Sequence, residues 1–327
     1  MREMLRIAVL VTAGILTAGC GSACRIEFVE KPDRIDVVAC GRPVTSYIYG
    51  NDLNLVLAEP DRLLTKPILY PLYSPSGSKV TRRFPLESIE GESTDHPHHT
   101  GLFFAYDEIG EDKGFWNNSS TSLPAIKHVR TVRKKDGVIS VELHWLGKDG
   151  GVLLEEKRDM AFAADEGRYI IDFYISLTAE RDNITFHDTK EGMFAIRVAD
   201  WLREKDGTGE YLSSNGQRTE KEVWGRRGRW MRLQGKKNGK TVGVAILNHP
   251  SSVNFPTYWM ARSYGLFSAN PLGQYIYQRH HKYDNPQRLD LTLEKGQTAP
   301  FGFRVVIYEG DMPPEKLEQL YADFAGR

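Results

Sequence analysis

Three histidines fall within four residues in the segment 91–102, which reads GESTDHPHHTGL. An imidazole titrates near neutral pH, ligates metal ions and hydrogen-bonds to hydroxyl groups. Such a cluster therefore suits general acid-base chemistry, metal binding or the recognition of a sugar. The candidate residues of this segment are Asp95, His96, His98 and His99. The alternative interpretation is a rigid loop, kinked at Pro97, whose histidines are simply solvated.

A second segment, 186–197 (FHDTKEGMFAIR), carries charged side chains among apolar ones in a strand-like run. Charges interleaved with Phe and Met indicate the floor of a cleft, in which a carboxylate beside Lys190 is expected to be ionised and to accept a proton. The candidate residues of this segment are His187, Lys190, Glu191 and Arg197. The alternative is a sheet face on which opposite charges neutralise one another.

A third segment, 248–273, is rich in amides and aromatic rings and is interrupted by glycine and proline. Aromatic rings pack on the C–H groups of sugars, while amides, imidazoles and guanidinium groups bind hydroxyls; this is the usual composition of a concave site for a small ligand. The candidate residues are Asn248, His249, Asn254, Trp259, Arg262 and Asn270. The alternative is a structured loop that covers one end of the fold. Trp116 is a further aromatic candidate, or part of the core.

Strands must position these segments, because alternating apolar residues recur through most of the chain. Clear examples are 138–145, 169–177 and 301–307, each with one apolar face. Turn pairs such as Asp136-Gly137 and Asn238-Gly239 separate long strands. The pattern predicts an all-β fold, a large antiparallel β-sandwich.

The C-terminus predicts a helix. Two prolines at 313 and 314 suit a first helical turn, and apolar residues follow at helical spacing, namely Leu317, Leu320, Tyr321 and Phe324. We expect one face of this helix to pack on the sandwich. No linker or repeat divides the chain, so residues 20–327 are predicted to form a single domain.

The N-terminus predicts export. Residues 1–6 contain two arginines, and the apolar run 7–18 is shorter than the ~20 residues that span a bilayer. Small residues precede Cys20, as at a bacterial lipoprotein processing site, so residues 1–19 are predicted to be a signal peptide and Cys20 to be lipidated. The alternative is a plain secretory signal. In the oxidising compartment that follows, Cys24 and Cys40 are candidates for a disulfide.

The overall charge argues against one class of partner. The 327 residues include 43 Lys and Arg against 43 Asp and Glu, so the formal net charge is zero and no global basic field attracts nucleic acid. With 40% hydrophobic residues the chain can bury a large core. We expect membrane contact only through the lipid anchor, and a periplasmic or outer-membrane location in a bacterium.

Together the motifs resemble a bacterial family of unknown function that is often labelled PmoA, or methane oxygenase-like. The resemblance covers nearly all of the mature chain. The matching elements are the most specific run Asp95-His96-Pro97-His98-His99, then Phe115-Trp116, segments 70–72 and 80–82, Lys190-Glu191-Gly192 and Asn248-His249-Pro250. A membrane methane monooxygenase subunit would need several long apolar spans, and the chain has none after residue 20, so that activity is rejected.

This resemblance implies an exported protein of polysaccharide-degrading bacteria, with a fold similar to the galactose-mutarotase-like supersandwich. In such enzymes a histidine acid and a carboxylate base act on opposite sides of a sugar ring. The catalytic candidates so implied are His98, His99, His187, Glu191 and His249. We expect Arg197 and Arg262 to hold an oxyanion or a substrate carboxylate and Trp259 to stack on the sugar.

Several activities stay open at this point. Epimerase, lyase and hydrolase chemistry are alternatives, including a glycosidase that pairs Glu92 or Asp95 with Glu191. No cofactor is expected, yet His96 and His98 would suit a divalent metal together with a histidine and a carboxylate from the set His187, His249, Asp188 and Glu191. A non-catalytic glycan-binding surface lipoprotein is the third hypothesis. A shared site requires the three segments to meet in the fold.

Overall fold

The computed structural model describes residues 24–49, 63–118, 123–165 and 167–327. Within these ranges the chain forms two eight-stranded sheets and one four-stranded sheet, and paired strands run antiparallel. The all-β antiparallel sandwich predicted from the alternating patterns is confirmed.

The first large sheet has the order β1 (Ile26–Glu30), β2 (Arg34–Ala39), β3 (Arg42–Ile48), β4 (Ile68–Leu69), β5 (Leu102–Tyr106), β13 (Gly192–Arg197), β18 (Leu266–Asn270) and β17 (Tyr258–Ala261). The second has the order β14 (Glu210–Ser213), β15 (Trp230–Lys237), β16 (Lys240–Asn248), β20 (Thr298–Glu309), β11 (Arg168–Ala179), β10 (Val152–Asp165), β9 (Val138–Leu146) and β8 (Ala125–Lys135). The small sheet has the order β19 (Leu291–Leu293), β12 (Ile184–Phe186), β6 (Glu108–Ile109) and β7 (Asp112–Lys113).

The two large sheets pack face to face, and the main core lies between them. Phe194 of β13 stacks on Phe303 of β20, with ring centroids 4.4 Å apart. Phe104 of β5 contacts Phe301, also of β20, at 5.7 Å. Strand alternation explains these contacts, because every second side chain of a strand points to the same face.

The same alternation defines the outer face of the first sheet. Phe103 is one residue from Phe104 in β5 and Arg197 is three residues from Phe194 in β13, so both side chains point away from the second sheet. This outer face is covered, since Trp116 packs on the Phe103 ring with centroids 4.8 Å apart and Arg197 has no exposed surface. Loops that run over the outer face of the first sheet are therefore in a position to build a site.

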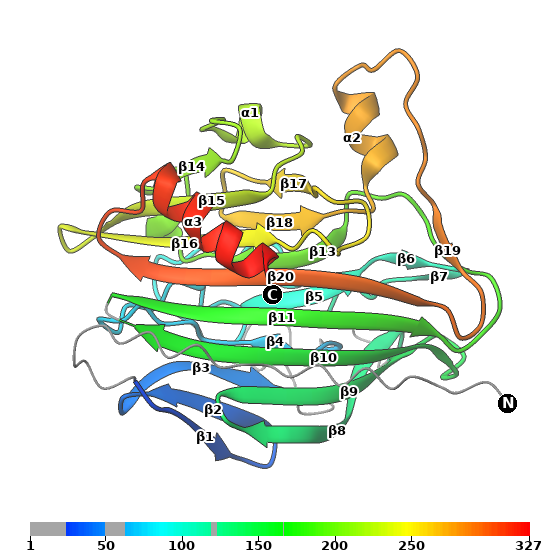
Figure 1. Cartoon of the computed structure of the whole chain (residues 1–327), viewed down its shortest axis with the longest axis horizontal. Coiled ribbons are helices and arrows are strands. Elements are labelled where there is room, and N and C mark those ends of the chain that lie inside the picture. The colour runs from blue at the N-terminus through cyan, green and yellow to red at the C-terminus, as the bar shows by residue number, and fades with distance from the viewer. Residues whose placement is uncertain (1–23, 50–62, 119–122, 166) are drawn as a thin grey trace, which may run out of the picture.

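The C-terminal helix α3 (Pro314–Ala325) packs on the outer face of the second sheet (Figure 1). Its buried residues Leu317 and Phe324 join a second hydrophobic cluster with Trp230 and Tyr308. The predicted helix and its apolar face are confirmed. The other helices are the 3₁₀ turn η1 (Asp200–Leu202), α1 (Glu220–Val223) and α2 (Gln274–His280); Figure 1 shows α1 and α2 at the top of the view, beyond β17 and β18.

The sulfurs of Cys24 and Cys40 are bonded, with Cα atoms 5.3 Å apart. This bond ties the start of the described chain to the turn after β2. The predicted lipidation site Cys20 and the predicted signal peptide lie outside the described residues. Among the residues that are described, no helix is long and apolar enough to cross a membrane.

Candidate functional site

The three segments singled out from the sequence meet in one cavity of about 410 Å³ over the outer face of the first sheet. Its walls come from the loop before β5, the segment after β7, the loop before β13 and the turn between β17 and β18. We call it the histidine cavity; its lining residues are His96, His98, His99, Trp116, Asn117, Lys190, Glu191, Arg262 and Tyr264.

Strand order explains why segments so distant in the sequence converge. The strand β13 lies between β5 and β18, so the histidine loop that precedes β5 and the turn that precedes β18 both neighbour β13. The Arg197 amide donates to the carbonyl of Gly101 at 2.9 Å, which fixes the end of the histidine loop against the sheet. Gly101 has φ +59°, and a Cβ atom there would lie 2.4 Å from the Leu69 carbonyl oxygen. Only glycine fits this close approach.

Two buried arginines hold Asp95 beneath the histidine loop. Arg82 Nη1 and Arg197 Nη2 donate to Asp95 Oδ1 at 2.8 and 2.7 Å, and neither arginine side chain has exposed surface. Burial raises the pKa of the Asp95 carboxyl, but Arg197, the hydrogen bond with His96 and Arg82 outweigh it, and the net pKa is below the ordinary value. Asp95 is thus an ionised anchor rather than a proton donor.

Asp95 in turn orients His96. The Asp95 Oδ2 atom lies 2.5 Å from His96 Nδ1, and because a carboxylate only accepts, Nδ1 carries the proton. The His96 ring lies parallel to the rings of His99 and Tyr264, with centroids 4.9 and 4.8 Å away. His96 therefore has a fixed ring and tautomer, and its Nε2 is the nitrogen left to exchange a proton with a ligand.

His99 plays a different part from the one expected. Its side chain is buried, and neither ring nitrogen has a hydrogen-bond partner among the described residues. Burial, followed by the nearby His98 and Arg197, holds its pKa well below the usual range. His99 is thus an uncharged part of the cavity wall at neutral pH. His98 also lines the cavity, and its ring packs edge-on against the His99 ring with centroids 4.2 Å apart.

Glu191 is the acidic residue of the cavity lining, and its carboxylate is bound by Lys190 Nζ. Asn270 holds this stretch of backbone in place. Its buried amide donates to the carbonyls of Thr189 and Lys190 at 3.0 and 3.2 Å. Asn270, a predicted substrate ligand, is therefore a positioning residue for Glu191.

Two of the predicted catalytic histidines lie outside the histidine cavity. His187 Nε2 lies 3.0 Å from the carbonyl oxygen of Gly110, next to the small sheet. The ring of His249 packs against Phe324 of α3 at 4.9 Å, on the outer face of the second sheet. The reason is topological, because β12 pairs with β6 and β19 while His249 follows β16 of the other large sheet.

Three other predicted ligands are also elsewhere. Trp259 has no exposed surface; it lies opposite Ala269, which lies opposite Phe194, so its side chain is on the core face. Asn248 is buried and accepts from the Thr257 amide at 3.1 Å. Asn254 donates to the Pro271 carbonyl at 2.7 Å. All three residues shape loops or core rather than the cavity.

Of the donors proposed for a divalent metal, His96, His98 and Glu191 line one cavity, but the further histidine, His187 or His249, lies outside it. The Asp188 carboxylate accepts from the amides of Tyr275 and Ile276 in the first turn of α2, at 2.7 and 3.1 Å. Across the described ranges, no group of three or more His, Cys, Asp or Glu residues has an arrangement that would hold a metal ion. The expectation that no cofactor is needed, and the divalent metal that was its alternative, both stay untested.

Three residues that support or extend the site were missed from the sequence. Lys66 is buried behind Trp116 and donates to the Trp116 carbonyl at 2.7 Å and to Asn118 Oδ1 at 3.0 Å. Burial lowers the pKa of Lys66 to about 7, although Asp107 opposes this shift. Tyr264 lies in the third sequence segment but was not among its candidate residues. Trp224 lies in a loop outside all three segments. The only signal for Trp224 is its position before the basic run Arg226-Arg227.

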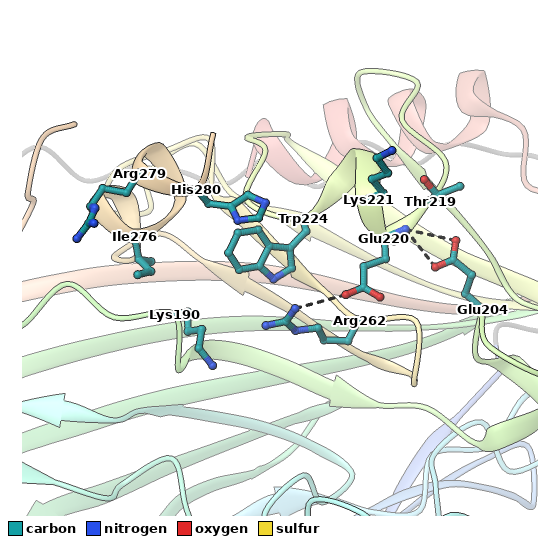
Figure 2. A pocket seen from close by; sticks show the side chains of 10 residues that line it. All are labelled: Lys190, Glu204, Thr219, Glu220, Lys221, Trp224, Arg262, Ile276, Arg279 and His280. Carbon is teal, nitrogen blue, oxygen red and sulfur yellow. Dashed lines mark hydrogen bonds and ion pairs between the residues drawn. The ribbon is translucent and has the colours of Figure 1, made fainter. Parts of the chain in front are cut away.

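Trp224 lines a second, larger cavity of about 940 Å³ (Figure 2). The two cavities share Lys190 and Arg262, so they are neighbouring parts of one recess. We call the second one the tryptophan cavity; its lining residues are Lys190, Glu204, Thr219, Glu220, Lys221, Trp224, Arg262, Ile276, Arg279 and His280.

The sequence pattern of a family described as "Family of unknown function (DUF6807)" matches residues 34–322. The chain belongs to this family. The match includes every residue of both cavities, so the recess lies within the DUF6807 region. The resemblance to the PmoA label is not tested by this match and stays a prediction.

No curated protein matches the chain in sequence. Among solved structures, a galactose mutarotase-like protein from Clostridium acetobutylicum is 11% identical with a TM-score of 0.36, over 89% of this chain and 100% of the other. A GalM/aldose epimerase homologue from C. elegans is 10% identical with a TM-score of 0.34, over 89% and 100%. A polysaccharide lyase is 10% identical with a TM-score of 0.35, over 92% of this chain, which spans about a third (34%) of that lyase.

Proposed function

We propose that this protein acts on a sugar or a glycoside by histidine and glutamate acid-base chemistry in the histidine cavity. The observation that carries the proposal is the convergence of His96, His98 and Glu191 on one cavity, although they come from segments more than 90 residues apart. A histidine and a carboxylate around one ligand are the pair that general acid-base catalysis requires.

The two groups have different surroundings, which suggests their roles. Glu191, bound by Lys190, is the base that takes a proton from the substrate. His96 is the acid: Asp95 keeps the Nδ1 proton in place, and the doubly protonated ring gives its Nε2 proton to the substrate and takes a proton back at Nε2 afterwards. The Arg262 guanidinium and the Tyr264 hydroxyl supply hydrogen bonds to ring hydroxyls, and the Trp116 ring supplies an apolar wall.

Export belongs to the same proposal. The disulfide between Cys24 and Cys40 supports it, because structural disulfides persist in oxidising compartments and are rare in the cytosol. Lipidation at Cys20 would then anchor the protein in a bacterial membrane, with the sandwich in the periplasm or on the cell surface.

The test is a panel of monosaccharides and glycosides followed by NMR in D₂O. That readout separates anomer exchange, deuterium uptake at carbon, elimination and hydrolysis, and so identifies the reaction. We expect Glu191→Gln and His96→Gln each to lower the turnover rate about 10²-fold or more, the usual contribution of one acid or base. His187→Gln is the matched control, because His187 lies outside the cavity and should leave turnover unchanged.

Two results would overturn the proposal. The first is full turnover in both cavity variants, which would place the chemistry elsewhere. The second is sugar binding without turnover of any panel member, which would support the glycan-binding alternative.

A further inference from the structure

The tryptophan cavity adjoins the histidine cavity, and most of its lining residues have no part in the proposed chemistry. Figure 2 shows Trp224 between His280 of α2 and the guanidinium of Arg262, with Lys190 nearby. The centroids of the Trp224 and His280 rings are 4.2 Å apart, and Arg262 Cζ lies over the Trp224 ring, 5.2 Å from its centroid. The volume of the tryptophan cavity, about 940 Å³, is within the range of sites that enclose a small-molecule ligand.

Positive charge in this cavity lacks full compensation. Lys221 and Arg279 are exposed, and neither has a carboxylate partner among the described residues. Arg262 has one longer ion pair, 3.4 Å from Nη1 to Glu220 Oε1. Figure 2 shows Lys221 and Arg279 on opposite sides of Trp224, so an anionic ligand in the cavity would meet a cation without a described carboxylate partner at either end.

The two carboxylates of the cavity are already engaged. Glu220 Oε2 accepts from the Ser263 amide at 2.8 Å, in addition to its ion pair with Arg262. Glu204 accepts from the Glu220 amide at 3.1 Å. Burial raises the pKa of Glu204, and the neighbouring charges of Glu220 and Glu222 add to the rise although the amide hydrogen bond opposes it. These carboxylates oppose a bound anion less than free surface carboxylates would.

We infer that the tryptophan cavity binds an anionic sugar unit, one that carries a carboxylate or a sulfate group, next to the unit that reacts in the histidine cavity. The exposed part of the Trp224 ring and the Ile276 side chain would pack on the apolar C–H groups of that unit, and Lys221 at one end of the cavity or Arg279 at the other would bind its anionic group. The inference rests on the proposed function, because the two cavities join at Lys190 and Arg262 and so form one site for a single oligosaccharide.

The test measures binding by titration calorimetry on the full-length protein. The probes are trigalacturonate, a sulfated galactose trisaccharide and neutral galactotriose, with inorganic sulfate as the free-anion control. We expect at least one anionic trisaccharide to bind at least tenfold more tightly than galactotriose, with an affinity that falls as salt rises. The comparison of the two anionic probes then identifies which anionic group is preferred.

The double variant Lys221→Gln/Arg279→Gln should reduce the affinity for the preferred anionic trisaccharide to about that of galactotriose. Lys295→Gln is the matched control, because Lys295 is an exposed lysine of the turn before β20 and lines neither cavity. Equal affinity for neutral and anionic trisaccharides, tight binding of inorganic sulfate alone at the same site, or an unchanged affinity in the double variant would overturn the inference.

Binding and turnover separate this inference from the proposed function. Anion-selective binding together with full turnover in the Glu191→Gln variant would refute the acid-base proposal and leave the subsite standing. Turnover of neutral sugars that depends on Glu191, without any preference for anionic probes, would refute the subsite and leave the acid-base proposal standing.

Discussion

The substitution Asp95→Asn tests whether the histidine cavity is built on a buried ion pair. Asp95 compensates two guanidinium groups, those of Arg82 and Arg197, which have no exposed side-chain surface. Asparagine keeps the size and one oxygen acceptor but removes the charge. Both arginines would then remain buried without this carboxylate, and His96 would lose the acceptor that fixes its Nδ1 proton.

The size of the effect follows from burial. Breaking a buried pair by removal of one partner costs about 3–5 kcal/mol, because a buried charge is left uncompensated. Since the Asp95 side chain is 38% exposed, solvent screens part of this loss. We expect the free energy of unfolding to fall by about 2–3 kcal/mol at pH 7.

The pH dependence has a definite sign. The folded protein holds the pKa of Asp95 below the ordinary value near ~3.9, so the carboxylate stabilises the fold above that pH. This stabilisation is lost as pH falls through the folded-state pKa, because the folded and unfolded states then bind the same proton. The difference between the wild type and Asp95→Asn should therefore be constant from pH 5 to pH 7 and should shrink below pH 4.

Urea unfolding followed by tryptophan fluorescence measures the change, and NMR of the His96 ring reports its tautomer. Glu142→Gln is the matched control, since Glu142 forms a carboxylate-arginine pair with Arg130 on the surface and should show no measurable loss of stability. A loss below about 1 kcal/mol for Asp95→Asn, with an unchanged His96 tautomer, would refute the reasoning.

Two further predictions concern residues behind the cavity. Folding lowers the pKa of Lys66 to about 7. Between pH 7 and the ordinary lysine pKa near ~10.4, the unfolded chain therefore binds up to one more proton than the folded chain. The free energy of unfolding should then rise with pH, by at most about 1.4 kcal/mol per pH unit between pH 7 and pH 9. Lys66→Met should remove that slope in urea titrations, and an unchanged slope would show that Lys66 is charged in the fold. Gly101→Ala should lower the free energy of unfolding by at least ~2 kcal/mol, because its Cβ would meet the Leu69 carbonyl. Gly110→Ala is the matched control, because Gly110 has nearly the same φ, +58°, but no atom lies within 4 Å of the added Cβ. An equal loss of unfolding free energy in the two variants would show that contact with the Leu69 carbonyl is not the cause.

The sequence predicted the type of fold because the strand signal is local. Alternation over 138–145 needs only the residues of one strand, and in β9 the residues Ile139, Val141, Leu143 and Trp145 are indeed buried. The order of strands was not predictable in the same way. The position of β13 between β5 and β18 joins segments that are about 70 to 90 residues apart, and no local pattern specifies such a pairing.

The candidate site was predictable to the extent that residue type decides it. The histidine run, Glu191 and Arg262 carry chemistry that is visible in the sequence, and they share one cavity. The sequence did not show which face of the sheet each of these side chains would be on. Trp259 and Trp224 are equally suited to a sugar by type, but strand pairing turns Trp259 to the core while the loop after α1 brings Trp224 to the recess.

The stability of the fold alone gives no reason for the cluster of Arg82, Arg197 and Asp95. Apolar residues of similar size in place of a buried ion pair are often neutral or stabilising, so a buried guanidinium group is a poor way to stabilise a sheet face. The cluster does fix Asp95 Oδ1, which leaves Oδ2 to orient His96 above the same sheet. If that is its role, the loss of stability and the loss of the His96 tautomer in Asp95→Asn must occur together, whereas a purely structural cluster would lose stability and leave His96 unchanged.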